Sequence, residues 1–171
     1  MTTALVLAAA MAHIAPSFHS QHGRQELHAI ALQLTAYGRA RNIEPELLAA
    51  VAMRESTFRR DAQSTFPIWR GKGRNRRVIG EGHSTGVMGI KETTTLTSAD
   101  LTDLATNVSV GARLLAEAIK ACRGDVANGL TAFNRGIGKH AKNCKASSYS
   151  DEVLDFYQRI VAAVAAREER R

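Results

Sequence analysis

Apolar residues recur every three or four positions along most of this chain, which is the spacing of one face of an α-helix. The pattern predicts a helix over 24–41 and a second that begins at Pro45, because proline suits a first helical turn. Downstream it predicts a short helix capped by Ser98, a longer one opened by Asn107 and stopped by Gly124, one capped by Asp125 that ends near Gly136, and a last one capped by Ser148 or Ser150. The sequence therefore predicts a compact, mainly α fold.

Residues 59–85 have no helical period. Apolar residues there predict a small β-hairpin with Gly71 or Gly73 in its turn; they are Phe66, Ile68, Trp69, Val78 and Ile79. Its centre, 69–77, holds five positive charges. Such a segment is either a solvated loop tip or a nucleic-acid-binding segment.

The chain length of 171 residues is that of one domain. We expect an N-terminal extension over 1–23, the domain itself over 24–165 and a charged tail over 166–171. The apolar start of the extension resembles a weak signal peptide or a plain helix, and it is too short and alanine-rich for a membrane span.

The net charge of +7 indicates attraction to polyanions such as nucleic acid, anionic membrane or anionic cell wall, or it serves solubility alone. Two cysteines, Cys122 and Cys144, either form one disulfide or are two buried thiols.

Glu55 lies on the apolar face of the helix that begins at Pro45, with Leu48, Val51 and Ala52. Partial burial disfavours the charged carboxylate and raises its pKa, as a general acid requires. The alternative is that the acid, at a helix end, is solvated or is paired with Arg54 or Arg59.

No phosphate-binding glycine loop, zinc-binding His-Glu-x-x-His or serine-nucleophile motif is present, and the histidines are scattered. We therefore expect no cofactor and no metal.

Five short segments occur in a fixed order: Glu55–Phe58, Gly86–Ile90, Asn107–Leu115, Ala132–Gly136, and Tyr149 leading into Val153-Leu154. Together they resemble the soluble lytic transglycosylase family from about residue 27 to residue 160. That family has the fold of goose-type lysozyme, and the resemblance implies a lysozyme-like helical domain with a small irregular or hairpin insertion.

The resemblance also implies cleavage of peptidoglycan between N-acetylmuramic acid and N-acetylglucosamine. Glu55 matches the family's catalytic acid, which protonates the glycosidic oxygen and then deprotonates the muramyl 6-hydroxyl to form a 1,6-anhydro ring. A second carboxylate, as in two-acid glycosidases, is then not needed.

Further positions match the family's substrate-binding segments: Ser56, Met88, Gly89, Ile90, Phe133, Asn134 and Tyr149. Tyr149 matches the tyrosine that positions the catalytic acid. The chain departs from the family at Gly89, where a glutamine is usual, and at Phe133, where a tyrosine is usual.

Two rival functions stay open. A goose-type hydrolase would activate water with further acids, and Asp61 and Glu81 lie in the equivalent stretch. A catalytically weakened module would only bind peptidoglycan, as part of a phage virion or a secretion machine. In each case we expect the chain to act in the periplasm or envelope.

Overall fold

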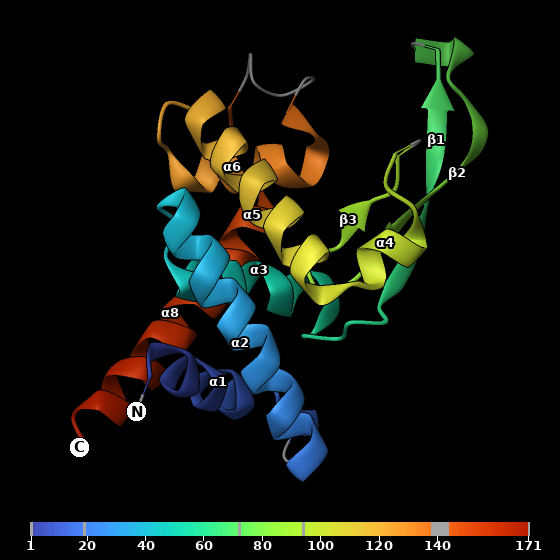
Figure 1. Ribbon diagram of the computed structural model, residues 1–171. Coiled ribbons are helices and arrows are strands. Elements are labelled where there is room, and N and C mark those ends of the chain that lie inside the picture. Colours follow the sequence, from blue (N-terminus) through green and yellow to red (C-terminus); the bar gives the residue numbers. More distant parts are fainter. Residues whose placement is uncertain (1, 19, 72, 94, 138–143, 171) are drawn as a thin grey trace.

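A computed structural model describes residues 2–170 except 19, 72, 94 and 138–143. Helices and strands follow one another in this order: α1 (Thr3–Ile14), the 3-10 turn η1 (Pro16–Phe18), α2 (Gln21–Arg41), α3 (Pro45–Ser56), β1 (Gln63–Arg70), the 3-10 turn η2 (Gly73–Asn75), β2 (Arg77–Thr85), β3 (Ile90–Lys91), α4 (Ser98–Thr102), α5 (Leu104–Ala121), α6 (Val126–Arg135) and α8 (Ser148–Glu168). The predicted mainly α fold with a small hairpin is confirmed (Figure 1).

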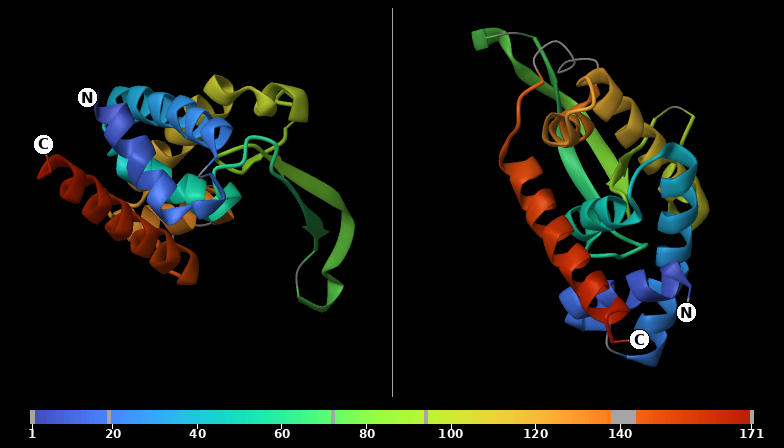
Figure 2. Two further views of the ribbon diagram at one scale, coloured as in Figure 1. Left: turned by 90° about the horizontal axis from the view of Figure 1, so that it is seen from below. Right: turned by 90° about the vertical axis from the view of Figure 1, so that its left-hand side faces the viewer.

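The helices form one body around a single large apolar core (Figures 1 and 2). Helix α3 packs against α2 and α8, and α5 packs against α2 and α6. The core draws its fully buried large side chains from almost every helix and includes Leu7, Met11, Leu27, Ile30, Leu34, Leu48, Leu115, Leu130 and Ile160. Burial of these side chains is the main stabilising contribution, each about 1.5–3 kcal/mol.

Helix α1 is part of this core. Seven of its twelve residues are buried, Leu5 is exposed, and the helix packs against both α2 and α8. An amphipathic stripe would need only one covered side, so the apolar run over Ala4–Met11 is explained by burial between two helices. No helix in the described part of the chain has the length and hydropathy of a membrane span.

Helix starts differ from prediction by a few residues because hydrogen-bonding caps, and not apolar spacing, set them. Ser20 caps α2 by accepting from the Gly23 N–H, so α2 begins before residue 24. Thr97, and not Ser98, caps α4. Asp103 caps α5 by accepting from the Thr106 N–H, so Asn107 does not open that helix.

The last helix is capped by Ser147, so the assignment to Ser148 or Ser150 was wrong. Ser150 instead closes the capping box, since its hydroxyl accepts from the Ser147 N–H at 2.9 Å. The predicted cap at Asp125 and the predicted end of this helix near Gly136 are confirmed, since Asp125 and Gly136 are the N-cap and C-cap of α6.

The hairpin predicted between 59 and 85 is confirmed and is longer than expected. Strands β1, β2 and β3 form one antiparallel sheet in that order. Gly71 and Gly73 lie in the β1–β2 connection with positive φ. The β1–β2 hairpin projects away from the helical body (Figures 1 and 2).

The two cysteines form a disulfide, with their Cα atoms 5.6 Å apart. It ties the end of α5 at Cys122 to the segment that leads into α8. Cys122 packs with Ala118 and Ala132, with Phe133 and Ile137 beside them. The bridge therefore fixes the segment before α8 to the end of α5, beside Phe133 and Ile137.

Candidate active site

Glu55 lies in the last turn of α3, and its helix is held in place by the apolar face that the sequence predicts. Leu48, Val51 and Ala52 on that face are fully buried. The backbone then turns sharply, because Thr57 and Phe58 both adopt positive φ. Glu55 itself is half-buried, at the edge where the helix leaves the core.

The carboxyl group of Glu55 is bonded to Tyr149 at the start of α8. The Tyr149 hydroxyl donates to Oε1 of Glu55 at 2.5 Å. Burial raises the pKa of Glu55, and the Tyr149 hydrogen bond and the charges of Arg54 and Lys91 oppose that rise. Burial, with the charge of Glu55, also raises the pKa of Tyr149, which therefore stays a proton donor.

The arginines near Glu55 in the sequence are paired with other acids. Arg54 binds Glu152 of α8 at 2.5 Å, and Arg59 binds Asp61 at 3.4 Å. Neither arginine forms a salt bridge with Glu55 among the described residues, so the predicted alternative of an Arg54 or Arg59 pair is not observed.

The loop 86–90 passes directly beside Glu55 and is held by two buried polar side chains. Ser56 donates to the Val87 carbonyl at 2.8 Å and to the Ala52 carbonyl at 3.0 Å. Asn107 accepts from the Met88 N–H at 2.8 Å and donates to the carbonyls of Thr85 and Leu101. These bonds link the ends of α3 and α5 to the loop and fix its path.

Gly89 is the point of closest approach between loop and acid. Its φ is +58°, and a Cβ placed there would lie 2.6 Å from Oε2 of Glu55. A glycine satisfies both constraints, since it has no Cβ and tolerates positive φ. With Oε1 bonded to Tyr149, Oε2 is the oxygen that faces Gly89.

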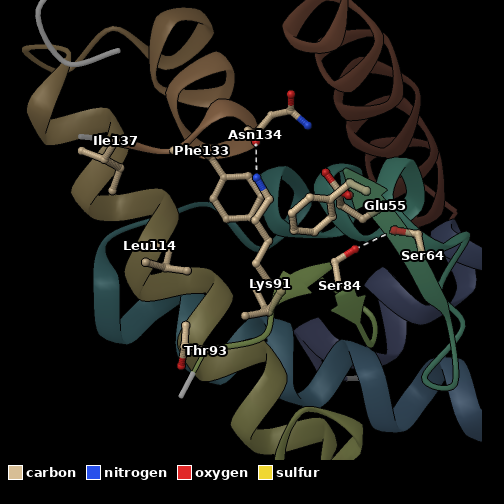
Figure 3. Close-up of a pocket in the computed structure, with 13 residues that line it drawn as sticks. Glu55, Ser64, Ser84, Lys91, Thr93, Leu114, Phe133, Asn134 and Ile137 are labelled. Carbon is tan, nitrogen blue, oxygen red and sulfur yellow. Dashed lines mark hydrogen bonds between the residues drawn. The ribbon is translucent and has the colours of Figure 1, made fainter. Parts of the chain in front are cut away.

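Glu55 and Gly89 border a cleft of about 530 Å³ between the sheet and helices α5 and α6 (Figure 3). Of the predicted substrate-binding residues, Ile90, Phe133 and Asn134 also line it. Phe133 packs against the core as well.

Three of the seven predicted substrate-binding residues, Met88, Ser56 and Tyr149, do not line the cleft, and Tyr149 is bonded to Glu55 instead. Met88 is fully buried, and its side chain lies against Gly111 beneath the cleft. Ser56 is buried, and its hydroxyl donates to backbone carbonyls. Neither side chain lines the cleft. Both instead hold the loop 86–90, which borders the cleft, against the helices.

Sequence reasoning missed the wall that the sheet contributes. Ser64 and Phe66 of β1 and Ser84 of β2 line the cleft, with a 2.7 Å hydrogen bond between the two serines. Lys91 reaches across, donating to the Asn134 carbonyl at 3.3 Å and lying over the Phe66 ring. The sequence pattern did not predict this wall, because it depends on the register in which β1 pairs with β2. The other lining residues are Thr93, Leu114, Gly136 and Ile137.

The acids considered for water activation lie elsewhere. Asp61 is exposed and paired with Arg59, and Glu81 is exposed on β2. Within the described part of the chain, Glu55 is the only carboxylate that lines the cleft. The same residues contain no cluster of side chains suited to a metal ion.

None of the curated proteins compared with the chain matches it. The family model described as Transglycosylase SLT domain matches residues 34–155, which include Glu55, the loop 86–90 and Tyr149. That family acts on peptidoglycan by lytic transglycosylase-type cleavage, and this chain belongs to the transglycosylase SLT domain family.

Proposed function

We propose that this protein is a peptidoglycan lytic transglycosylase that uses Glu55 as its one acid and base. The observation that carries the proposal is the Glu55–Tyr149 pair at the edge of the cleft, where burial raises the pKa of an acid already held in one position. The raised pKa favours the protonated form that a general acid needs. We assign the activity to residues 24–165.

In the first step Glu55 is the general acid. With Oε1 bonded to Tyr149, Oε2 donates its proton to the oxygen that joins N-acetylmuramic acid to N-acetylglucosamine. The bond from that oxygen to C1 of the muramyl sugar breaks, and the N-acetylglucosamine end leaves with the proton. Positive charge develops on the muramyl ring as an oxocarbenium-like state.

In the second step the Glu55 carboxylate is the general base. It takes the proton of the muramyl 6-hydroxyl, and the oxygen attacks C1 to close a 1,6-anhydro ring. Glu55 ends protonated, as it began, and no water is consumed. One carboxylate is enough because the nucleophile belongs to the substrate, which is consistent with a cleft whose described lining has a single acid.

The remaining cleft residues hold and position the sugar. Asn134 offers an exposed amide for the acetamido groups, and Phe133 and Phe66 offer ring faces for sugar rings. The Lys91 ammonium lies between the Asn134 carbonyl and the Phe66 ring, where it can contact the same sugars. We assign the backbone of Gly89 and Ile90 to the floor under the scissile bond.

A goose-type hydrolase is the second candidate, and its products distinguish it. Mass spectrometry of fragments released from purified peptidoglycan should show 1,6-anhydro-muramyl ends with wild type and no fragments with Glu55→Gln. Reducing muramyl ends would replace our proposal with hydrolysis. Wall binding without fragments would instead indicate a binding module.

We place the action of the protein in the periplasm or cell envelope, where peptidoglycan lies. The Cys122–Cys144 disulfide supports this, since such bonds persist mainly in oxidising compartments. The protein would reach that compartment as part of a phage virion or of a secretion machine. Detection of the disulfide in protein purified from its native setting under thiol-blocking conditions tests the compartment.

A further inference from the structure

One face of the β1–β2 hairpin is continuous with the cleft. Side chains alternate along a strand, so Ser64, Phe66 and Ile68 of β1 share a face, and Arg70 follows on the same side of β1 after a register shift between Ile68 and Trp69 that leaves Ile79 of β2 unpaired. Ser64 and Phe66 line the cleft, and the other two continue beyond it. At about 3.3 Å per residue, Arg70 lies roughly 20 Å from Ser64 along the strand.

The residues of β2 opposite Phe66 and Ile68 are glycines, so no β2 side chain covers this face at those positions. Phe66 is paired with Gly82 and Ile68 with Gly80. The Phe66 ring covers Gly82, since a Cβ there would lie 2.5 Å from a ring carbon, whereas a Cβ at Gly80 would meet nothing within 4 Å. The result is a low apolar strip, ending at Ile68, that leads away from the cleft.

Positive charge collects where this strip ends. Arg70 is paired directly with Arg77 across the two strands, a placement that is destabilising for like charges. With Arg74, Arg76 and Asn75 they line a hollow of about 550 Å³ at the tip. In the described part of the chain, no salt bridge neutralises any of these four arginines. An anion supplied from outside would relieve their repulsion.

We propose that this face extends the substrate cleft and that the arginines at its tip bind carboxylates of the peptide stems of peptidoglycan. This inference rests on the proposed function. Stems branch from the muramyl sugars and carry free carboxylates, and arginine binds carboxylates through two parallel hydrogen bonds. A glycan strand lying in the cleft would thus present a neighbouring stem to Arg70 and Arg77.

An anionic membrane is the competing partner for the same charges. Trp69 and Val78 are paired on the other face of the hairpin and are exposed, and Arg76 lies 4.5 Å from the Trp69 ring centre. Arg70 lies two residues beyond Ile68, where the strip that leads out of the cleft ends, and this favours the stem because a membrane contact would not need to adjoin the cleft.

The test uses Trp69, the single tryptophan of the chain, as a reporter at the tip. Its fluorescence is followed in the Glu55→Gln protein during titration with glycan strands that carry stems and with strands freed of stems by an amidase. We expect tighter binding of stem-bearing strands. In the Arg70→Gln/Arg77→Gln variant we expect about a fivefold weaker Kd for them, the size of two exposed ion pairs.

Arg41→Gln/Arg170→Gln removes the same charge from exposed positions outside the cleft lining and should keep the preference for stems. Equal Kd values for the two strand types, or an unchanged Kd in the hairpin variant, would overturn the inference. Tighter binding of phosphatidylglycerol vesicles than of stems, lost in the hairpin variant, would overturn it in favour of a membrane. Because binding is measured without turnover, failure of wild type to release anhydro-muramyl products would count against the proposed function alone.

Discussion

The Tyr149 hydroxyl lies 2.5 Å from Oε1 of Glu55, although 94 positions separate the two residues in the chain. The packing of α3 against α8 brings them together. This bond both orients the carboxyl group and opposes the rise in its pKa that burial causes. It also leaves the second carboxyl oxygen beside Gly89, at the cleft.

Replacing Tyr149 by Phe should lower kcat and move the pH profile. Without the hydrogen bond, the pKa of Glu55 rises further, because the bond stabilises the carboxylate. The loss of kcat/KM at high pH, where the acid has lost its proton, should then begin at a higher pH than in wild type. Initial rates on purified peptidoglycan across the pH range measure this, and a descending limb moved to lower pH would contradict it.

Replacing Glu55 by Gln should stabilise the protein at neutral pH while abolishing activity. The pKa of Glu55 is raised in the folded state, so its contribution to stability is present below the unfolded value of 4.5 and is lost as the pH rises through the folded value. A neutral Gln escapes that loss. Thermal denaturation should show a higher Tm for Glu55→Gln at neutral pH and no gain well below pH 4.5. A gain that is equal at both pH values would argue against a desolvated acid.

Replacing Gly89 by Ala should reduce kcat by about tenfold to a hundredfold, since a displacement of an ångström in a reacting group has effects of this size. The new Cβ would meet Oε2 of Glu55 at 2.6 Å and strain a backbone with positive φ. Gly124→Ala is the matched control, because Gly124 also has positive φ and its Cβ would meet nothing within 4 Å. Both variants should lose the stability that a positive φ costs alanine, Gly89→Ala should lose more because of its contact with Glu55, and only Gly89→Ala should lose kcat. Equal activity of the two would mean that the approach of Gly89 to the acid is unimportant.

Removing the disulfide by Cys122→Ser/Cys144→Ser should lower the stability of the oxidised protein by about 3 kcal/mol, the value for a loop of this length. For a domain of this size the Tm should fall by about 10 °C. Activity should fall too, since the bridge packs beside Phe133 and Ile137 of the cleft wall. Dithiothreitol should reproduce the effect in wild type and leave the double variant unchanged. A Tm insensitive to reductant would exclude this role.

Much of the fold followed from the sequence because it depends on local patterns. The buried face of α3, with Glu55 at its end, is a matter of spacing along one helix. The caps at Asp125 and Gly136 are local as well. Errors appeared where neighbouring residues compete for one role, as Ser147, Ser148 and Ser150 do at the start of α8, since only the hydrogen bonds made decide among them.

The sequence by itself determined the class of fold and the position of Glu55 at the end of an apolar helix face, and its resemblance to the family indicated Tyr149 as the partner of Glu55. Tertiary structure decided which side chains reach the cleft. Met88 and Ser56 lie beneath it, whereas Ser64, Phe66 and Ser84 enter it through the register of β1 and β2. The physical reason is that local spacing specifies which face of an element is apolar, while the pairing of distant segments determines what that face meets.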